Sequence, residues 1–194
     1  MTPQMGEVTT LDVNTLIAAH AAIGDAHHSE VHGAAQHNDV TRELFIPANS
    51  GHVVTGSPSV RGRFGAVTGT ANTDQPAVYF SIKVPDDFVS FTSLKAVWMS
   101  PAAAGNMRWA FLSDYAAPGE VYSTHGDDPA VGVTATGGAD KLNVQESANP
   151  ITLASLVSGD YIGIGFSRSG SHADDTLDDA MYLLGLLFTY VAEQ

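Results

Sequence analysis

The strongest constraint on the fold comes from two apolar stretches near the end of the chain. Residues 159–168 read GDYIGIGFSR, an alternation with a period of two that is typical of a half-buried strand. Residues 181–191 read MYLLGLLFTYV, a nearly continuous apolar run that suits a strand buried on both faces. An acidic loop, residues 169–179, separates the two stretches. We therefore expect them to form the closing β-hairpin of an all-β domain.

From Arg42 onward the sequence reads as a series of short strands. The clearest is residues 77–84, in which every second side chain is apolar. Residues 94–99 and 106–112 predict another hairpin. Many short strands joined by Gly- and Pro-rich turns favour a β-sandwich, and the long crossing loops favour a jelly-roll-like one. Further strand candidates are residues 60–68, 120–123, 131–136 and 142–146.

The first 40 residues have a different composition. They contain no lysine or arginine but carry five of the eight histidines. Their few large apolar side chains cannot offset the entropy of ordering a lone segment of this length. We therefore predict a short helical or extended docking arm over residues 1–40 and a jelly-roll-like β-sandwich over residues 41–194. The side chains expected to contact a partner are Leu11, Val13, Leu16, Ile17 and Ile23.

Charge and composition exclude several partners. The chain has 21 acidic and 8 basic residues, a formal net charge of −13, so nucleic acid and anionic membrane surfaces are disfavoured. No apolar run reaches the roughly 20 residues that a membrane-spanning helix needs. The first residues lack the basic start and apolar core of a secretory signal, and we expect folding in the cytoplasm. With no cysteine, stability must come from packing or from oligomerisation.

Two groups of side chains are candidate metal ligands. His28 and His32 are four residues apart and would share one face of a helix, as zinc, nickel or copper sites require. Asp174 and Asp175 offer the oxygen ligands that calcium prefers. The alternatives are histidines in an interface and aspartates that cap turns. Because neither group has the spacing of a known metal motif, we expect no metal and no other cofactor.

The sequence does not predict an enzyme. It contains no Gly-x-Ser-x-Gly motif, and Ser171 and His172 are sequence neighbours, which is poor evidence for a catalytic triad. Aromatic side chains are available to bind sugars, although most occupy strand positions where core packing is the commoner outcome. These aromatic candidates are Trp98, Trp109, Tyr115, Tyr122 and Tyr161.

The chain resembles structural proteins of tailed bacteriophages, of the jelly-roll capsid decoration or head-fibre type. The resemblance is carried by an Ala/His-rich leader, AHAAIGDAHHS, followed by a β-domain that ends with GDYIGIGFSR and DDTLDDAMYLLG. It implies a homotrimeric capsid decoration (cement) protein on the virion surface, synthesised in the host cytoplasm. The N-terminal arm would dock on the major capsid protein. The resemblance carries over no catalytic residue.

A second hypothesis belongs to another class of function. A phage fibre or receptor-binding module would recognise a host-surface carbohydrate through aromatic side chains in its loops. The arm separates the two hypotheses, since a decoration protein needs its first 40 residues for docking and a carbohydrate-binding domain does not.

Overall fold

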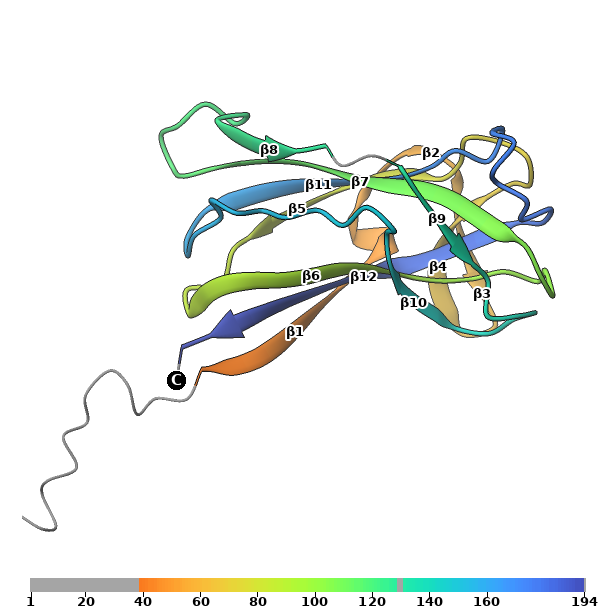
Figure 1. Cartoon of the computed structure of the whole chain (residues 1–194), viewed down its shortest axis with the longest axis horizontal. Helices are drawn as coiled ribbons and strands as arrows, with labels where there is room; N and C mark the ends of the chain where they lie inside the picture. Colours follow the sequence, from red (N-terminus) through yellow and green to blue (C-terminus); the bar gives the residue numbers. More distant parts are fainter. Residues whose placement is uncertain (1–38, 129–130, 194) are drawn as a thin grey trace, which may run out of the picture. The chain divides into compact units, whose positions relative to one another are not determined.

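The protein is described by a computed structural model for residues 39–128 and 131–193. Within these residues, twelve strands form two six-stranded sheets (Figure 1). The β12 sheet contains β1 (Val40–Pro47), β3 (Ser57–Arg61), β4 (Phe64–Gly69), β6 (Phe88–Met99), β10 (Asn143–Glu146) and β12 (Met181–Ala192). The β11 sheet contains β2 (His52–Thr55), β5 (Ala77–Lys83), β7 (Asn106–Ala116), β8 (His125–Asp127), β9 (Gly132–Ala135) and β11 (Tyr161–Arg168). A short 3-10 helix, η1 (Ala48–Ser50), follows β1.

The two sheets pack face to face, which confirms the predicted all-β sandwich (Figure 1). The order along the first sheet is β10-β6-β12-β4-β3, with β1 also paired to β12. The order along the second is β2-β5-β11-β7-β8, with β9 also paired to β7. Along the described strands, the chain crosses to the other sheet at every connection except those between β3 and β4, between β7 and β8, and between β8 and β9. This crossing pattern is the jelly-roll-like arrangement that the sequence predicts.

Both predicted hairpins are wrong. β11 and β12 do not pair with each other, because β11 lies between β5 and β7 and β12 lies between β6 and the strands β1 and β4. Likewise, β6 pairs with β10 and β12, whereas β7 pairs with β8, β9 and β11. An inner strand of each sheet needs neighbours on both edges, and strands distant in the sequence supply them here.

Two other strand predictions also need correction. Residues 60–68 do not form a single strand: they contain the end of β3, a turn at Gly62 with φ of 61°, and most of β4. Residues 120–123 are a loop rather than a strand. Gly119, with φ of 97°, turns the chain just before them, and Ala117 donates its backbone N–H to the Glu120 carboxylate at 2.9 Å. The strands expected at residues 131–136 and 142–146 are β9 and β10.

The core lies between the two sheets and is rich in aromatic rings. The β11 sheet contributes Trp109, Phe111 and Phe166, and the β12 sheet contributes Trp98 and Phe188, all fully buried. The expectation that residues 181–191 are buried on both faces is confirmed for most of β12. On its outer face, β12 packs in a second small cluster made of Ala66, Val97, Met99 and Leu184.

The predicted docking arm falls almost wholly outside the described residues. This holds for all of its predicted contact residues, Leu11, Val13, Leu16, Ile17 and Ile23, and for His28 and His32. The arm and its partner therefore stay predictions. Within residues 39–128 and 131–193, no helix has the length and apolar character required to cross a membrane.

Candidate functional site

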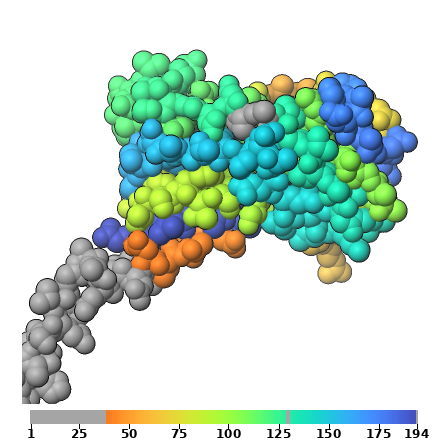
Figure 2. All heavy atoms as spheres, in the orientation of Figure 1, coloured from red at the N-terminus to blue at the C-terminus, as the bar shows by residue number. Residues whose placement is uncertain are grey.

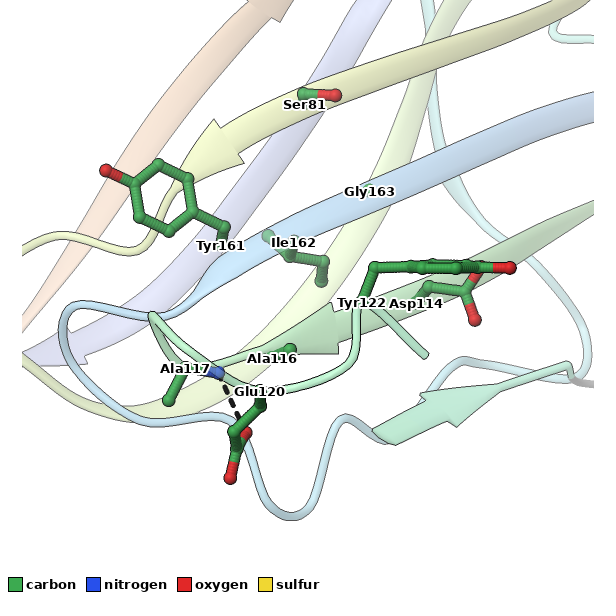
Figure 3. A pocket seen from close by; sticks show the side chains of 9 residues that line it. All are labelled: Ser81, Asp114, Ala116, Ala117, Glu120, Tyr122, Tyr161, Ile162 and Gly163. Carbon is green, nitrogen blue, oxygen red and sulfur yellow. Dashed lines mark hydrogen bonds between the residues drawn. The ribbon is translucent and has the colours of Figure 1, made fainter. Parts of the chain in front are cut away.

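The outer face of the β11 sheet carries a hollow of about 470 Å³. Its floor is formed by β11 between its two neighbours, β5 and β7, and the loop between β7 and β8 forms one wall. Figure 3 shows the rings of Tyr161 and Tyr122 on opposite sides of the hollow, with Ile162 and the backbone of Gly163 between them. The complete lining is Ser81, Asp114, Ala116, Ala117, Glu120, Tyr122, Tyr161, Ile162 and Gly163.

The floor of the first hollow is open because glycine occupies an outward position of β11, at Gly163. Side chains alternate along a strand, so Tyr161, Gly163 and Gly165 share the outer face while Ile162 and Ile164 enter the core. A Cβ placed on Gly163 would come no closer than 3.7 Å to any atom beyond its chain neighbours. The space above the central strand is therefore unfilled at this residue.

The side walls of the hollow are the outward residues of the neighbouring strands. Gly163 lies directly opposite Ser81 on β5 and opposite Asp114 on β7. Two residues further along β11, Gly165 lies opposite Tyr79 on β5 and Leu112 on β7. These pairs place two rows of side chains on either side of a glycine-lined strip.

The loop between β7 and β8 presents Tyr122 to solvent from an ordered turn. Glu120 and Ala117 bond to each other twice: the Glu120 carboxylate accepts the Ala117 N–H, and the Glu120 N–H donates to the Ala117 carbonyl at 3.1 Å. Thr124 then donates both its N–H and its hydroxyl to the Val121 carbonyl, at 2.9 and 2.7 Å. Tyr122 sits between these two turns with 77% of its surface exposed. Figure 2 shows this loop and β8 as the blue-green atoms at the top left of the domain.

A second hollow of about 280 Å³ adjoins the first. The two share Asp114 and Gly163 in their linings, and we call these two adjoining hollows on the outer face of the β11 sheet the sheet groove. The ring of Tyr79, half exposed, lies over Gly165, where an added Cβ would be 2.9 Å from Tyr79 Cε1. The other residues lining the second hollow are Leu112, Ser113 and Asp128.

The charged side chains of the sheet groove are all acidic. They are Asp114, Glu120 and Asp128, and no lysine or arginine lines either hollow in the described part of the chain. The nearest cation by strand register is Lys83, opposite Tyr161 at the end of β5. Its ammonium group hydrogen-bonds to Asp86, and that bond and the Asp86 charge raise the pKa of Lys83 above its ordinary value. The groove is therefore an aromatic and anionic surface.

The five aromatic residues that the sequence offered as sugar-binding candidates fall into two groups in the structure. Trp98, Trp109 and Tyr115 are core residues, whereas Tyr122 and Tyr161 are exposed and line the same hollow. Tyr79 and Asp114 were not among the residues predicted to bind a ligand. Two features of the sequence marked the outward positions: polar side chains alternate with apolar ones in β5, and glycines stand at alternate positions in β11. Neither feature specifies which strands become neighbours.

The acidic loop between β11 and β12 serves a structural purpose. The carboxylate of Asp175 is fully buried and accepts two hydrogen bonds from Arg168, at 2.8 and 3.0 Å, and one from the backbone N–H of Arg108 at 2.9 Å. These bonds occupy the oxygens that would bind calcium. Asp174 is exposed. Within the described residues, no group of three histidine or acidic side chains is placed to hold a metal ion.

Ser171 and His172 are likewise used in loop structure. The Ser171 hydroxyl and backbone N–H both donate to Asp74, at 2.9 and 3.0 Å, and lower the pKa of that carboxyl. His172 Nδ1 accepts the backbone N–H of Asp174 at 3.2 Å. The polar atoms of Ser171 and His172 are therefore used in loop hydrogen bonds, and the two side chains do not bond to each other as a nucleophile and its base would.

The sequence matches no protein-family model and no curated protein. Among solved structures, the carbohydrate-binding module CBM36 in complex with calcium and xylotriose is 13% identical, with 76% of this chain and 98% of that chain covered and a TM-score of 0.43. The mannan-recognising module TmCBM27 is 9% identical, with 77% and 98% covered and a TM-score of 0.37. TmCBM61 in complex with β-1,4-galactotriose is 9% identical, with 78% and 88% covered and a TM-score of 0.34. Likenesses this distant carry no inference about what this chain binds.

Proposed function

We propose that the protein binds an oligosaccharide in the sheet groove. The observation that carries the proposal is the pair of exposed tyrosine rings, Tyr122 and Tyr161, on either side of an open glycine floor. A sugar ring has apolar C–H faces and a polar hydroxyl edge. Aromatic rings with a polar tip suit the faces, and the carboxylate and hydroxyl oxygens of Asp114, Glu120 and Ser81 suit the edge.

The dimensions of the groove favour a chain of sugars over a single one. Its two hollows have volumes of about 470 and 280 Å³ and meet over Asp114 and Gly163. Tyr161 and Tyr122 line the first hollow, and Tyr79 lines the second. A ligand that extends along the sheet surface would contact tyrosine in both hollows.

Single-stranded nucleic acid is the other ligand class that stacks on aromatic side chains. Its phosphates would need a basic track, and the described lining contains carboxylates instead. The net charge of −13 adds a general repulsion. A carbohydrate therefore fits the groove better than a nucleic acid does.

The test is the affinity of the full chain for a panel of linear oligosaccharides, measured by isothermal titration calorimetry. We expect Tyr161→Ala and Tyr122→Ala each to weaken binding about 5- to 30-fold, because each removes an exposed ring that the ligand would bury, worth about 1–2 kcal/mol. Phe64→Ala is the matched control: Phe64 is 55% exposed, comparable to Tyr161 at 58%, but lies on the other sheet.

Two outcomes would contradict the proposal. One is that the native chain binds no member of a panel covering neutral, amino and acidic sugars. The other is that both tyrosine variants bind as tightly as the Phe64→Ala control. Circular dichroism of each variant establishes that the fold is retained.

Deleting residues 1–38 distinguishes this function from the virion-assembly hypothesis. The sheet groove and the hydrophobic core lie within residues 39–193, so we expect the truncated chain to bind the same oligosaccharide within about twofold, less than 0.5 kcal/mol. A decoration protein would instead lose attachment to capsids, measured by co-sedimentation. Loss of sugar binding in a folded truncated chain would count against the groove as the site.

A further inference from the structure

We infer that the sheet groove selects glycans whose sugars carry free ammonium groups, that is, unacetylated amino sugars. The inference rests on the proposed function and deepens it. It starts from the sign of the charge in the groove: Asp114, Glu120 and Asp128 line the two hollows, and the described lining contains no basic side chain to balance them. The hydroxyl groups of a neutral sugar could donate hydrogen bonds to these carboxylates but would leave their charge unbalanced, whereas a protonated amine would also balance the charge.

Asp114 occupies the central position because it borders both hollows. Its strand is held on both edges, since Asp114 lies opposite Gly163 of β11 and Gly126 of β8. Gly126 lies beside this residue: a Cβ there would be in ordinary contact with Asp114 Oδ1 at 3.4 Å, and its close approach would be to the Ser113 carbonyl oxygen at 2.7 Å. Asp114 itself is exposed, and it forms no side-chain hydrogen bond with another described residue.

Glu120, on the loop between β7 and β8, supplies a second carboxylate to the lining of the first hollow. One of its oxygens, Oε2, is held by the Ala117 N–H at 2.9 Å, which orients the group and leaves Oε1 available (Figure 3). Asp128 places a third negative charge in the second hollow. A chain of sugars that fills both hollows would therefore meet a carboxylate in each.

The cations on this face of the sheet do not neutralise the groove. Lys83 is paired with Asp86 at the end of β5. Arg108 is near the opposite end of β7, close to Asp74, whose pKa is lowered mainly by hydrogen bonds from Ser171 and to a smaller extent by the Arg108 charge. The rest of the chain adds to the negative potential, with 21 acidic against 8 basic residues. Uronic acids and sulfated sugars would be repelled by this field, and ammonium groups would be attracted.

A basic peptide carries the same sign of charge as an amino sugar, but the position of the groove in the sheet does not suit a peptide. An extended peptide commonly binds by adding a strand to a free sheet edge. The groove lies on a sheet face instead, and its central strand β11 is paired on both edges, with β5 and with β7. The exposed rings of Tyr122 and Tyr161 offer flat apolar surfaces, which suit sugar faces.

The test compares matched β-1,4-linked tetramers that differ in one substituent: glucosamine, N-acetylglucosamine, glucose and glucuronic acid. Calorimetry is done with the full chain at a mildly acidic pH, which keeps the sugar amine protonated. We expect the glucosamine tetramer to bind about tenfold more tightly than the glucose tetramer, with up to about fivefold from each exposed charge pair. This advantage should shrink when the salt concentration rises from about 0.01 M to about 0.5 M.

Substitutions of single carboxylates test whether the preference for glucosamine arises from the sheet groove. Asp114→Asn should reduce the ratio of glucosamine to glucose affinities by about threefold or more, because it removes the central charge and keeps the shape of the side chain. The matched control is Glu43→Gln, which changes the net charge equally but lies on exposed β1 of the other sheet and should leave the ratio unchanged.

The outcomes separate this inference from the proposed function. If the glucose and glucosamine tetramers bind equally, the selection for amines is wrong and carbohydrate binding stands. If none of the tetramers binds, and no other oligosaccharide does, both fail together. If tetralysine binds as tightly as the glucosamine tetramer, or if Glu43→Gln lowers the affinity ratio as much as Asp114→Asn, the effect is general attraction to an acidic protein and the inference is overturned.

Discussion

Replacing Arg168 by alanine is expected to lower the free energy of unfolding by about 3–5 kcal/mol, because it would leave the buried carboxylate of Asp175 without its counter-charge. Both side chains of this ion pair are fully buried. Arg168 also donates to the backbone carbonyl of Leu177 at 2.7 Å and to that of Asp179 at 3.4 Å. One guanidinium group therefore connects the end of β11 to the loop that leads to β12. Without it, several buried oxygen atoms would lose their hydrogen-bond donor.

Urea denaturation of the native chain and of four variants measures this effect. Asp175→Leu should be similarly destabilising, because it leaves Arg168 charged and unpaired. The double variant Arg168→Met with Asp175→Leu should lose clearly less than the sum of Arg168→Met and Asp175→Leu, since neither charge is then buried alone. Additive losses, or a loss below about 1 kcal/mol for Arg168→Ala, would mean that the pair is not what orders this loop.

Replacing Phe166 by alanine should cost about 3–5 kcal/mol of stability, since it removes a fully packed ring from the centre of the core. Phe166 is 1% exposed, and its ring centroid lies 5.5 Å from that of Trp109 and 6.0 Å from that of Phe111. The three rings meet in tilted and edge-to-face arrangements, which add to the stability gained from burial alone. Phe80, also buried, is expected to behave in the same way.

Thermal and chemical unfolding of Phe166→Ala, with Phe64→Ala as its control, checks this prediction. Phe64 is 55% exposed on β4, so its replacement should cost less than about 1 kcal/mol. If Phe166→Ala and Phe64→Ala were equally mild, the inner and outer faces of the β11 sheet would be wrongly assigned. The sheet groove would then be wrongly placed too, because its open floor depends on the same alternation along β11.

The candidate site was partly readable from the sequence. Tyr122 and Tyr161 were among the five aromatic candidates, and the structure places both beside one hollow. Tyr79 and Asp114 were not recognised, because each comes from a different strand and their relation appears when β11 lies between β5 and β7. Nothing in the local sequence of Asp114 distinguishes it from the other acidic residues of an acidic chain. The predicted arm contacts from Leu11 to Ile23 lie outside the described residues and await their own test.

For β5, β11 and β12, the sequence by itself determined that the segment forms a strand and which of its side chains are buried. Period-two alternation in β5 and β11, and the apolar run of β12, specify these properties locally because successive side chains of a strand point to opposite faces. The pairing of strands was decided by the tertiary structure, as the two wrongly predicted hairpins demonstrate. Backbone hydrogen bonds are the same for every residue type except proline, so an alternating pattern fits many partners equally well. The groove depends on that pairing, because its glycine strip, tyrosines and carboxylates come together only when three particular strands are neighbours.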